Sequence, residues 1–125
     1  MKDDGKSPHR KSILCVEDNK DTCEMLGILF SEYEFVSADT VKKASALIDE
    51  RRFDLYILDN WLPDGSGIDL CRKIRAADKS VPIIFVSGVG YPDDIKEATE
   101  AGADKYLVKP CEPESIEKIV KELIR

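Results

Sequence analysis

The sequence predicts an α/β domain with a doubly wound parallel sheet of five strands and five helices. Five short apolar segments alternate with five segments whose apolar residues recur at helical spacing. Crossovers between parallel strands are right-handed, so the helices should cover both faces of the sheet. Four of the apolar segments also run into reactive side chains, and the carboxyl ends of parallel strands form one edge where ligands bind. These reactive residues are Glu17 with Asp18, Asp59, Ser87 and Lys109.

The first strand and helix are indicated by their apolar patterns. Residues 13–16 are short and wholly apolar, as expected of a strand buried on both faces. Apolar side chains three and four positions apart then predict a helix over residues 20–34, which Asn19 or Asp21 would cap. A short strand is expected over residues 35–38.

The middle of the chain repeats this order. Residues 41–51 carry the second helical pattern, and residues 55–59 form the third apolar segment. The stretch WLPDGSG, residues 61–67, is dense in turn formers and predicts a loop, in which Gly65 and Gly67 would relieve backbone constraints. Helical spacing resumes after this loop.

Proline and glycine mark the element boundaries in the last third. Pro82 precedes the fourth apolar segment at residues 83–86, and a flexible connection follows it. Pro92 suits the first turn of a helix that should end at Gly102. Residues 105–108 predict the fifth strand, and apolar residues at helical spacing after it predict the final helix.

The composition excludes several classes of protein. Nineteen Lys and Arg against 25 Asp and Glu give a net charge of −6, which opposes direct binding to nucleic acid. Four scattered cysteines without a CxxC pair, and the single His9, argue against zinc and for reduced thiols. No apolar run is long enough to insert into a membrane, and no signal-peptide core is present. We expect a cytoplasmic protein with a mobile tail over residues 1–11 and one domain over residues 12–125.

Four motifs carry a resemblance to a known family. They are ILCVEDN, ILDNWLPDGSG, IIFVSG and AGADKYLVKP, each in order at the end of a predicted strand. Over residues 12–125 the chain resembles the receiver domain of two-component response regulators, such as the chemotaxis regulator with its flavodoxin-like sheet of order 2-1-3-4-5. The resemblance implies the following roles: Asp59 as phosphoryl acceptor, Glu17 and Asp18 as metal-binding acids, Ser87 as switch hydroxyl, Lys109 as phosphate-binding amine and Tyr106 as switch aromatic.

Physical chemistry supports a metal at this edge of the sheet. Three carboxylates in one crevice repel each other, so a divalent cation or bound protons should offset their charge. Mg²⁺ prefers oxygen ligands and commonly joins one or two carboxylates to a phosphate, and Mn²⁺ is the alternative cation. Asp18 and Asp59 are expected as direct ligands, with Glu17 acting through water and the backbone carbonyl of Trp61 completing the set.

The same site supports phosphoryl transfer. An ionised Asp59 can attack phosphorus and form an acyl phosphate, with catalysis mainly by positioning and charge neutralisation from Lys109 and the metal. Ser87 would donate to a phosphate oxygen. The expected phosphoryl donor is a sensor histidine kinase or a histidine phosphotransfer protein, and the switch would change the surface that binds an output partner. The pocket rim is expected to comprise Asn60, Trp61, Gly88, Val89 and Pro110, the last after a cis peptide bond.

Structural interpretations of the same residues exist. Asp59 and Ser87 are common helix-capping residues, Lys109 could be a solvated surface amine, and Tyr106 could be a half-buried strand aromatic. Their co-occurrence at four strand ends favours the functional interpretation.

Two other functions occur on a similar architecture. A phosphohydrolase of the haloacid dehalogenase type also uses a nucleophilic aspartate, but its DxD pattern is absent after Asp59. A flavin or nucleotide carrier would need a glycine-rich phosphate loop after the first strand, where Glu17 and Asp18 stand instead.

The sequence leaves open whether this is a single-domain regulator or part of a longer protein, and whether phosphorylation controls its oligomeric state.

Overall fold

The computed structural model describes residues 10–124, so most of the tail expected at residues 1–11 lies outside the described residues. In chain order the elements are β1 (Ser12–Val16), α1 (Lys20–Leu29), β2 (Glu34–Ala38), α2 (Val41–Glu50), β3 (Leu55–Leu58), β4 (Trp61–Leu62), β5 (Gly65–Ser66), α3 (Gly67–Ala77), β6 (Ile83–Ser87), α4 (Pro92–Ala101), β7 (Lys105–Val108) and α5 (Pro113–Leu123). Within this part of the chain, no helix has the length and apolar character needed to cross a membrane.

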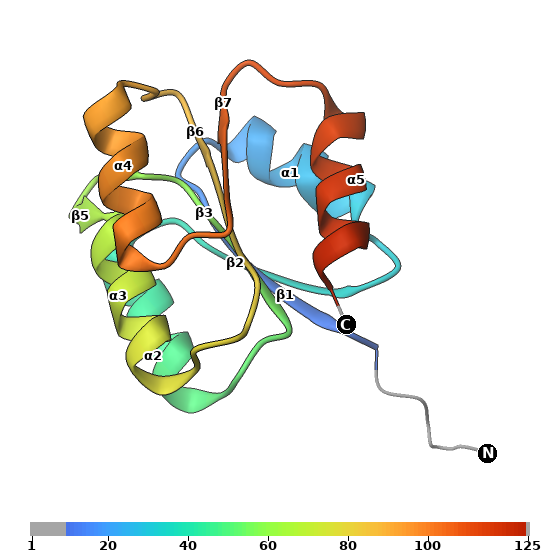
Figure 1. Ribbon diagram of the computed structural model, residues 1–125. Coiled ribbons are helices and arrows are strands. Elements are labelled where there is room, and N and C mark those ends of the chain that lie inside the picture. The colour runs from blue at the N-terminus through green and yellow to red at the C-terminus, as the bar shows by residue number, and fades with distance from the viewer. Residues whose placement is uncertain (1–9, 125) are drawn as a thin grey trace.

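The main sheet has the predicted topology. Its five strands are parallel and lie in the order β2-β1-β3-β6-β7 (Figure 1), which is 2-1-3-4-5 when these strands are numbered along the chain. Strand order reverses between β1 and β3, because β2 lies outside β1 while β6 and β7 extend the other side. The carboxyl ends at this reversal are where an open sheet of this kind forms its ligand crevice.

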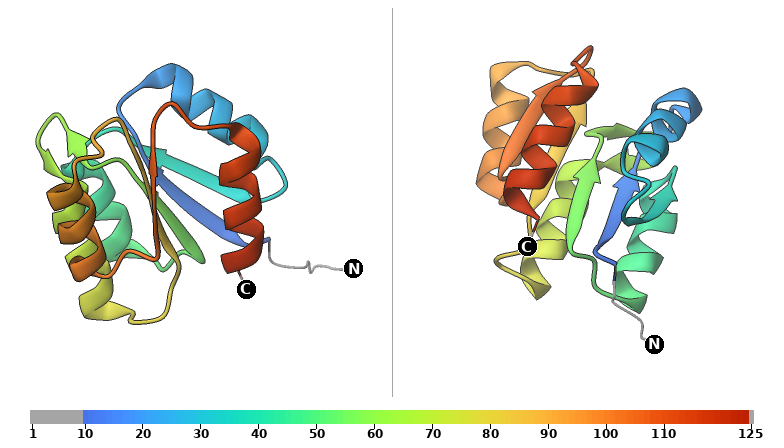
Figure 2. Two further views of the ribbon diagram at one scale, coloured as in Figure 1. Left: turned by 45° about the horizontal axis from the view of Figure 1, so that its top comes forward. Right: turned by 90° about the vertical axis from the view of Figure 1, so that its right-hand side faces the viewer.

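Helices cover both faces of the sheet, as expected. Figures 1 and 2 show α1 and α5 together on one face and α2, α3 and α4 on the other. Side chains of β1 alternate between the two cores: Ile13 and Cys15 pack with α1 and α5, whereas Leu14 and Val16 pack with the other three helices. Because both faces are covered, the central strands are buried and the functional side chains emerge at their ends.

Two element boundaries differ from the prediction. The helix expected over residues 20–34 ends at Leu29, since Phe30 leaves the helical conformation and its N–H donates to the carbonyls of Leu26 and Ile28. Phe30 and Tyr33 are apolar positions at helical spacing, which extended the predicted helix too far. In the structure both side chains pack inward from the turn after the helix, with ring centroids 6.0 Å apart. The expected loop at residues 61–67 contains a two-stranded antiparallel hairpin formed by β4 and β5.

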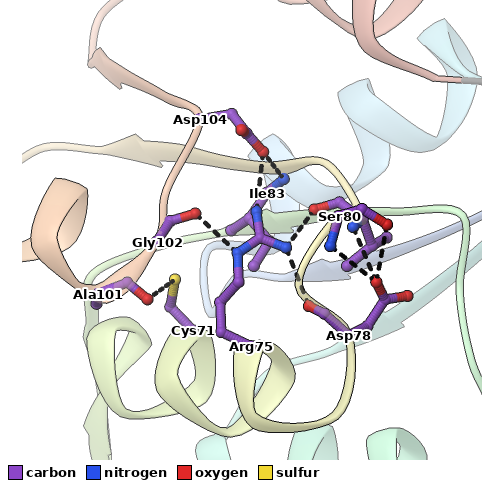
Figure 3. Close-up of polar contacts among 9 residues, drawn as sticks. Cys71, Arg75, Asp78, Ser80, Ile83, Ala101, Gly102 and Asp104 are labelled. Carbon is purple, nitrogen blue, oxygen red and sulfur yellow. Dashed lines mark hydrogen bonds and ion pairs between the residues drawn. The ribbon is translucent and has the colours of Figure 1, made fainter.

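Arg75 joins several segments at the opposite, amino end of the sheet. Its guanidinium donates to the Val81 carbonyl. Figure 3 shows its further hydrogen bonds to the carbonyls of Gly102 and Asp78 and to the Asp104 carboxylate. Asp104 also accepts from the Ile83 N–H at 2.9 Å, where β6 begins. The C-terminal turn of α3 is therefore tied to the starts of β6 and β7.

Candidate functional site

Strand register places the reactive residues at one edge. Val16 pairs with Leu58, so Glu17 and Asp59 leave neighbouring strands at the same level, and the Asp59 N–H donates to the Val16 carbonyl at 2.9 Å. On the next pair of strands the Lys109 N–H donates to the Ser87 carbonyl at 2.8 Å. The structure thus brings the strand-end residues together as the sequence predicted.

Three carboxyl groups form a compact acidic cluster. One oxygen from each of Glu17, Asp18 and Asp59 lies within 4.8 Å of the others. Glu17 and Asp59 are buried, with 4% and 8% of their surfaces exposed, whereas Asp18 is exposed. The Glu17 carboxylate accepts a hydrogen bond from the Asn19 N–H at 3.1 Å, and the Asn19 side chain in turn caps α1 through the Thr22 N–H. Helix capping and the geometry of the acids are therefore coupled.

Lys109 spans two of these acids. Its Nζ lies 2.7 Å from Glu17 Oε1 and 3.4 Å from Asp59 Oδ2, although the residues are 92 and 50 positions apart in the chain. The peptide bond from Lys109 to Pro110 is cis, as expected. The amine at the end of β7 therefore contacts the acidic cluster directly.

Burial and charge act in opposite directions in this cluster. Burial raises the pKa of Glu17, and the nearby Asp59 charge raises it further, while the Lys109 hydrogen bond lowers it in part. For Lys109, burial lowers the pKa, but the hydrogen bond to Glu17 and the charge of Asp59 outweigh it, so its pKa is raised overall. One ammonium contacts two of the three carboxyl groups, so carboxylate oxygens remain available for a cation.

Gly67 allows the acceptor loop, residues 59–66 after β3, to pack against the start of α3; the name refers to the role predicted for Asp59. Its N–H donates to the Asn60 carbonyl at 2.8 Å, and a Cβ at this position would lie 2.2 Å from the Asp59 carbonyl oxygen. Neither Gly65 nor Gly67 has a positive φ; among the glycines of residues 10–124, Gly102 has one. The constraint predicted at Gly67 is therefore one of space and not of backbone conformation.

Asp64 was not predicted as part of this region. From the turn between β4 and β5, its carboxylate accepts from the N–H groups of Val41 and Lys42 at 2.7 and 3.0 Å. The Val41 hydrogen bond is the main reason why the pKa of Asp64 is lowered. This pairing fixes the hairpin after Asp59 to the first turn of α2, and its 22–23-residue separation leaves no local signal in the sequence.

Ser87 and Tyr106 lie on the neighbouring strands β6 and β7. Ser87 is fully buried, and its Oγ accepts from the Val89 N–H at 3.2 Å. Tyr106 is half-buried, its ring stacks on Phe85 with centroids 5.4 Å apart, and its hydroxyl donates to the Val89 carbonyl. Both predicted switch residues therefore contact the same loop residue.

The residues predicted at the pocket rim differ in exposure. Trp61 is 63% exposed, Gly88 and Pro110 are exposed, and Val89 is half-buried. Asn60, in contrast, is only 1% exposed. Its amide faces inward because it bonds the Tyr106 hydroxyl at 3.4 Å and the Ser66 hydroxyl at 3.3 Å.

All four cysteines are free thiols. Cys23 lines a cleft of about 270 Å³ beside Glu17 and Asp18. A hydrogen bond from the buried Cys15 thiol lowers the pKa of Cys23 to about 6, and the pKa of Cys15 itself is raised. Burial raises the pKa of Cys111. Among the four cysteines, Cys23 is the one whose lowered pKa favours the thiolate.

Comparison with known proteins gives consistent matches. A family model described as "Response regulator receiver domain" matches residues 13–121. The phosphate regulon transcriptional regulatory protein PhoB of Pseudomonas aeruginosa is 34% identical over 119 residues, 92% of this chain and 52% of PhoB. The DNA-binding response regulator MtrA of Mycobacterium tuberculosis is 36% identical over 118 residues, 93% of this chain and 51% of MtrA. The chain therefore spans about half the length of these curated relatives.

Solved structures agree in fold. A two-component response regulator from Clostridium difficile has a TM-score of 0.86 and 30% identity, with 91% of this chain and 95% of that chain covered. A CheY-like receiver domain protein from Methanospirillum hungatei has a TM-score of 0.86 and 30% identity, with coverage of 90% and 92%.

Proposed function

The chain belongs to the receiver domain family of two-component response regulators, and we propose that it accepts a phosphoryl group on Asp59. The observation that carries this proposal is the position of Lys109 at the end of β7, where its ammonium lies 3.4 Å from Asp59 and 2.7 Å from Glu17. An isolated aspartate at a strand end is ordinary. Asp59, in contrast, is only 8% exposed and lies next to the Lys109 ammonium and two further acids. These surroundings are typical of a reactive carboxylate in a functional site.

The residues present fit a divalent cation. Glu17, Asp18 and Asp59 supply only oxygen ligands, the type that Mg²⁺ and Mn²⁺ prefer. We propose Asp18 and Asp59 as direct ligands, Glu17 as a ligand through water and the Trp61 carbonyl as the fourth protein contribution. When bound, the cation would neutralise charge on the incoming phosphoryl oxygens.

Each remaining residue has a defined task in the transfer. A carboxylate oxygen of Asp59 forms a bond to phosphorus while the bond between phosphorus and the donor's leaving group breaks. Lys109 stabilises charge on the transferred oxygens, since its ammonium already points toward Asp59. The Ser87 Oγ accepts from the Val89 N–H, so its own proton is free to donate to a phosphoryl oxygen. Slow hydrolysis of the acyl phosphate would return the domain to its starting state.

A signalling role follows from the family. We propose a sensor histidine kinase or a histidine phosphotransfer protein as donor, and residues 12–125 as the receiver domain. PhoB is named as a transcriptional regulatory protein and MtrA as a DNA-binding response regulator, and this chain matches about half of each. A DNA-binding output would therefore belong to a segment other than the receiver, whose net charge of −6 opposes direct contact with DNA. The relatives are response regulators, so the haloacid dehalogenase alternative gains no support.

The test is phosphorylation by a small donor. Purified protein is treated with acetyl phosphate with and without Mg²⁺, and the intact mass is recorded. We expect one phosphoryl adduct in the wild type with Mg²⁺ and none without it, because the acids repel a further anion until a cation offsets them. Asp59→Asn should remain unmodified. Equal labelling of Asp59→Asn and wild type would overturn the assignment.

A further inference from the structure

A buried amide stands next to the proposed acceptor. Asn60 follows Asp59 directly in the chain and is 1% exposed. A buried amide is costly unless its donor and acceptor groups are bonded. Its carbonyl oxygen accepts from the Ser66 hydroxyl at 3.3 Å, and its Nδ2 donates to the Tyr106 hydroxyl at 3.4 Å. The amide therefore links the acceptor loop to β7.

The Tyr106 hydroxyl uses both of its hydrogen-bonding roles. It accepts from Asn60 and donates to the Val89 carbonyl, while its ring lies parallel to Phe85 with an interplanar angle of 4°. A tyrosine hydroxyl has one proton to give, so the Asn60 amide is what satisfies its acceptor side. These contacts hold Tyr106 inward in the structure.

The chain of hydrogen bonds continues to Ser87. The Val89 residue that accepts from Tyr106 also donates its own N–H to Ser87 Oγ at 3.2 Å. This bond occupies an acceptor lone pair of the serine and leaves its O–H free as a donor. One continuous path, from Asn60 through Tyr106 and Val89 to Ser87, thus starts beside the acceptor aspartate and ends at the proposed switch hydroxyl.

We propose that Asn60 is a positioning residue, whose amide holds Tyr106 against Val89 and thereby pre-orients Ser87 for a phosphoryl group on Asp59. This inference rests on the proposed function. A group held in place before the ligand arrives lowers the cost of binding it. Loss of the amide should weaken the response to a phosphoryl mimic, through Tyr106 and not through general packing of the loop.

The experiment is a double-mutant cycle read with beryllofluoride. Trp61 is the single tryptophan and is next to the site, so its fluorescence reports the apparent affinity in the presence of Mg²⁺. Asn60→Leu keeps the size of the side chain and removes the amide, and Tyr106→Phe keeps the stacked ring and removes the hydroxyl. We expect Asn60→Leu to weaken apparent affinity by about threefold to tenfold, the usual effect of one hydrogen bond. In the Tyr106→Phe background the same substitution should change affinity less than about twofold.

A matched control is available in Tyr56. This tyrosine is also buried, and its hydroxyl accepts from the Phe53 N–H at 3.4 Å, apart from the Asn60 path. In the Tyr56→Phe background, Asn60→Leu should retain its full effect. An equal loss in the Tyr106→Phe and Tyr56→Phe backgrounds would overturn the inference and indicate a packing role for Asn60.

A second measurement does not require the Asn60 variant to fold. With 3-fluorotyrosine incorporated into the wild type, the ¹⁹F resonance missing in Tyr106→Phe identifies Tyr106. We expect it to show the small solvent isotope shift of a protected ring before beryllofluoride is added. A fully solvated Tyr106 would contradict the inference. Failure of wild type to bind beryllofluoride at all would instead count against the proposed function, so the two failures are distinguishable.

Discussion

Gly67→Ala should damage both stability and the acceptor. The new Cβ would lie 2.2 Å from the Asp59 carbonyl oxygen and 3.1 Å from Phe85, whereas real Cβ contacts essentially never fall below 3.0 Å. The nearest obstacle is backbone, so either α3 or the Asp59 peptide must move. Overpacking of this kind costs about 1–3 kcal/mol, which in a domain of this size lowers the unfolding midpoint by about 3–15 °C.

The movement also reaches the chemistry, because the displaced peptide is that of the proposed acceptor. A misplacement of about 1 Å can reduce a reaction rate on the order of 10²-fold. We expect the rate of labelling by acetyl phosphate with Mg²⁺ to fall on that scale in the fraction that remains folded. Thermal unfolding by circular dichroism and the rate of adduct formation by intact mass measure the two effects.

Gly88→Ala is the matched control. Gly88 lies in another loop of the same site, has no positive φ, and a Cβ there would have no heavy atom within 4 Å. Both substitutions restrict the unfolded chain by a similar amount, so this contribution cancels in the comparison. A stability of Gly67→Ala equal to that of Gly88→Ala, with unchanged labelling, would refute the steric reasoning.

Three further predictions concern the amine, the rim and a thiol. Lys109→Ala should leave Mg²⁺ binding intact or make it stronger, because the substitution removes a competing positive charge, and tryptophan fluorescence measures this binding. The same substitution should slow phosphorylation by about 10²-fold or more. A collapse of Mg²⁺ binding with the fold intact would contradict this prediction. The phosphoprotein should be long-lived, because neither the Trp61 nor the Val89 side chain can orient an attacking water. The double variant Trp61→Asn with Val89→Glu should shorten the lifetime of the phosphoryl group by about tenfold, or 1.4 kcal/mol of barrier. Phosphate release is timed after the donor is removed, and equal or slower release from the double variant would show that water access is controlled elsewhere. The rate of Cys23 alkylation by iodoacetamide should rise with pH around the Cys23 pKa of about 6, because the thiolate is the reactive form. At neutral pH this rate should exceed that of Cys111, whose pKa is raised. Peptide mapping measures both rates, and a Cys23 rate that rises only near pH 9 would contradict the assignment.

The positions of the strand-end residues could be predicted from the sequence because parallel pairing is regular. Once four apolar segments are taken as neighbouring parallel strands, Glu17, Asp59 and Lys109 must share an edge, whatever their separation in the chain. The order of strands came from the resemblance carried by the four motifs. The structure has that order.

Contacts that depend on loop geometry could not be predicted in this way. The helix expected to reach residue 34 ends at Leu29. The sequence pattern was misleading there, because Phe30 and Tyr33 have helical spacing but lie in the turn after the helix. Asn60 was expected at the rim, since polar loop residues are usually exposed; only the positions of Tyr106 and Ser66 in three dimensions provide partners for a buried amide. Two-residue strands such as those of the β4–β5 hairpin are too short to produce a periodic signal.

The central claim is that the phosphoryl group resides on Asp59, and reductive trapping tests it most directly. Borohydride reduces an aspartyl phosphate to homoserine, so protein treated with acetyl phosphate and Mg²⁺ is reduced, digested and sequenced by mass spectrometry. We predict homoserine at position 59 in the wild type, and unmodified aspartate there when Mg²⁺ or the donor is omitted. Homoserine at Asp18, or its absence from position 59 in protein whose intact mass shows the adduct, would contradict the account.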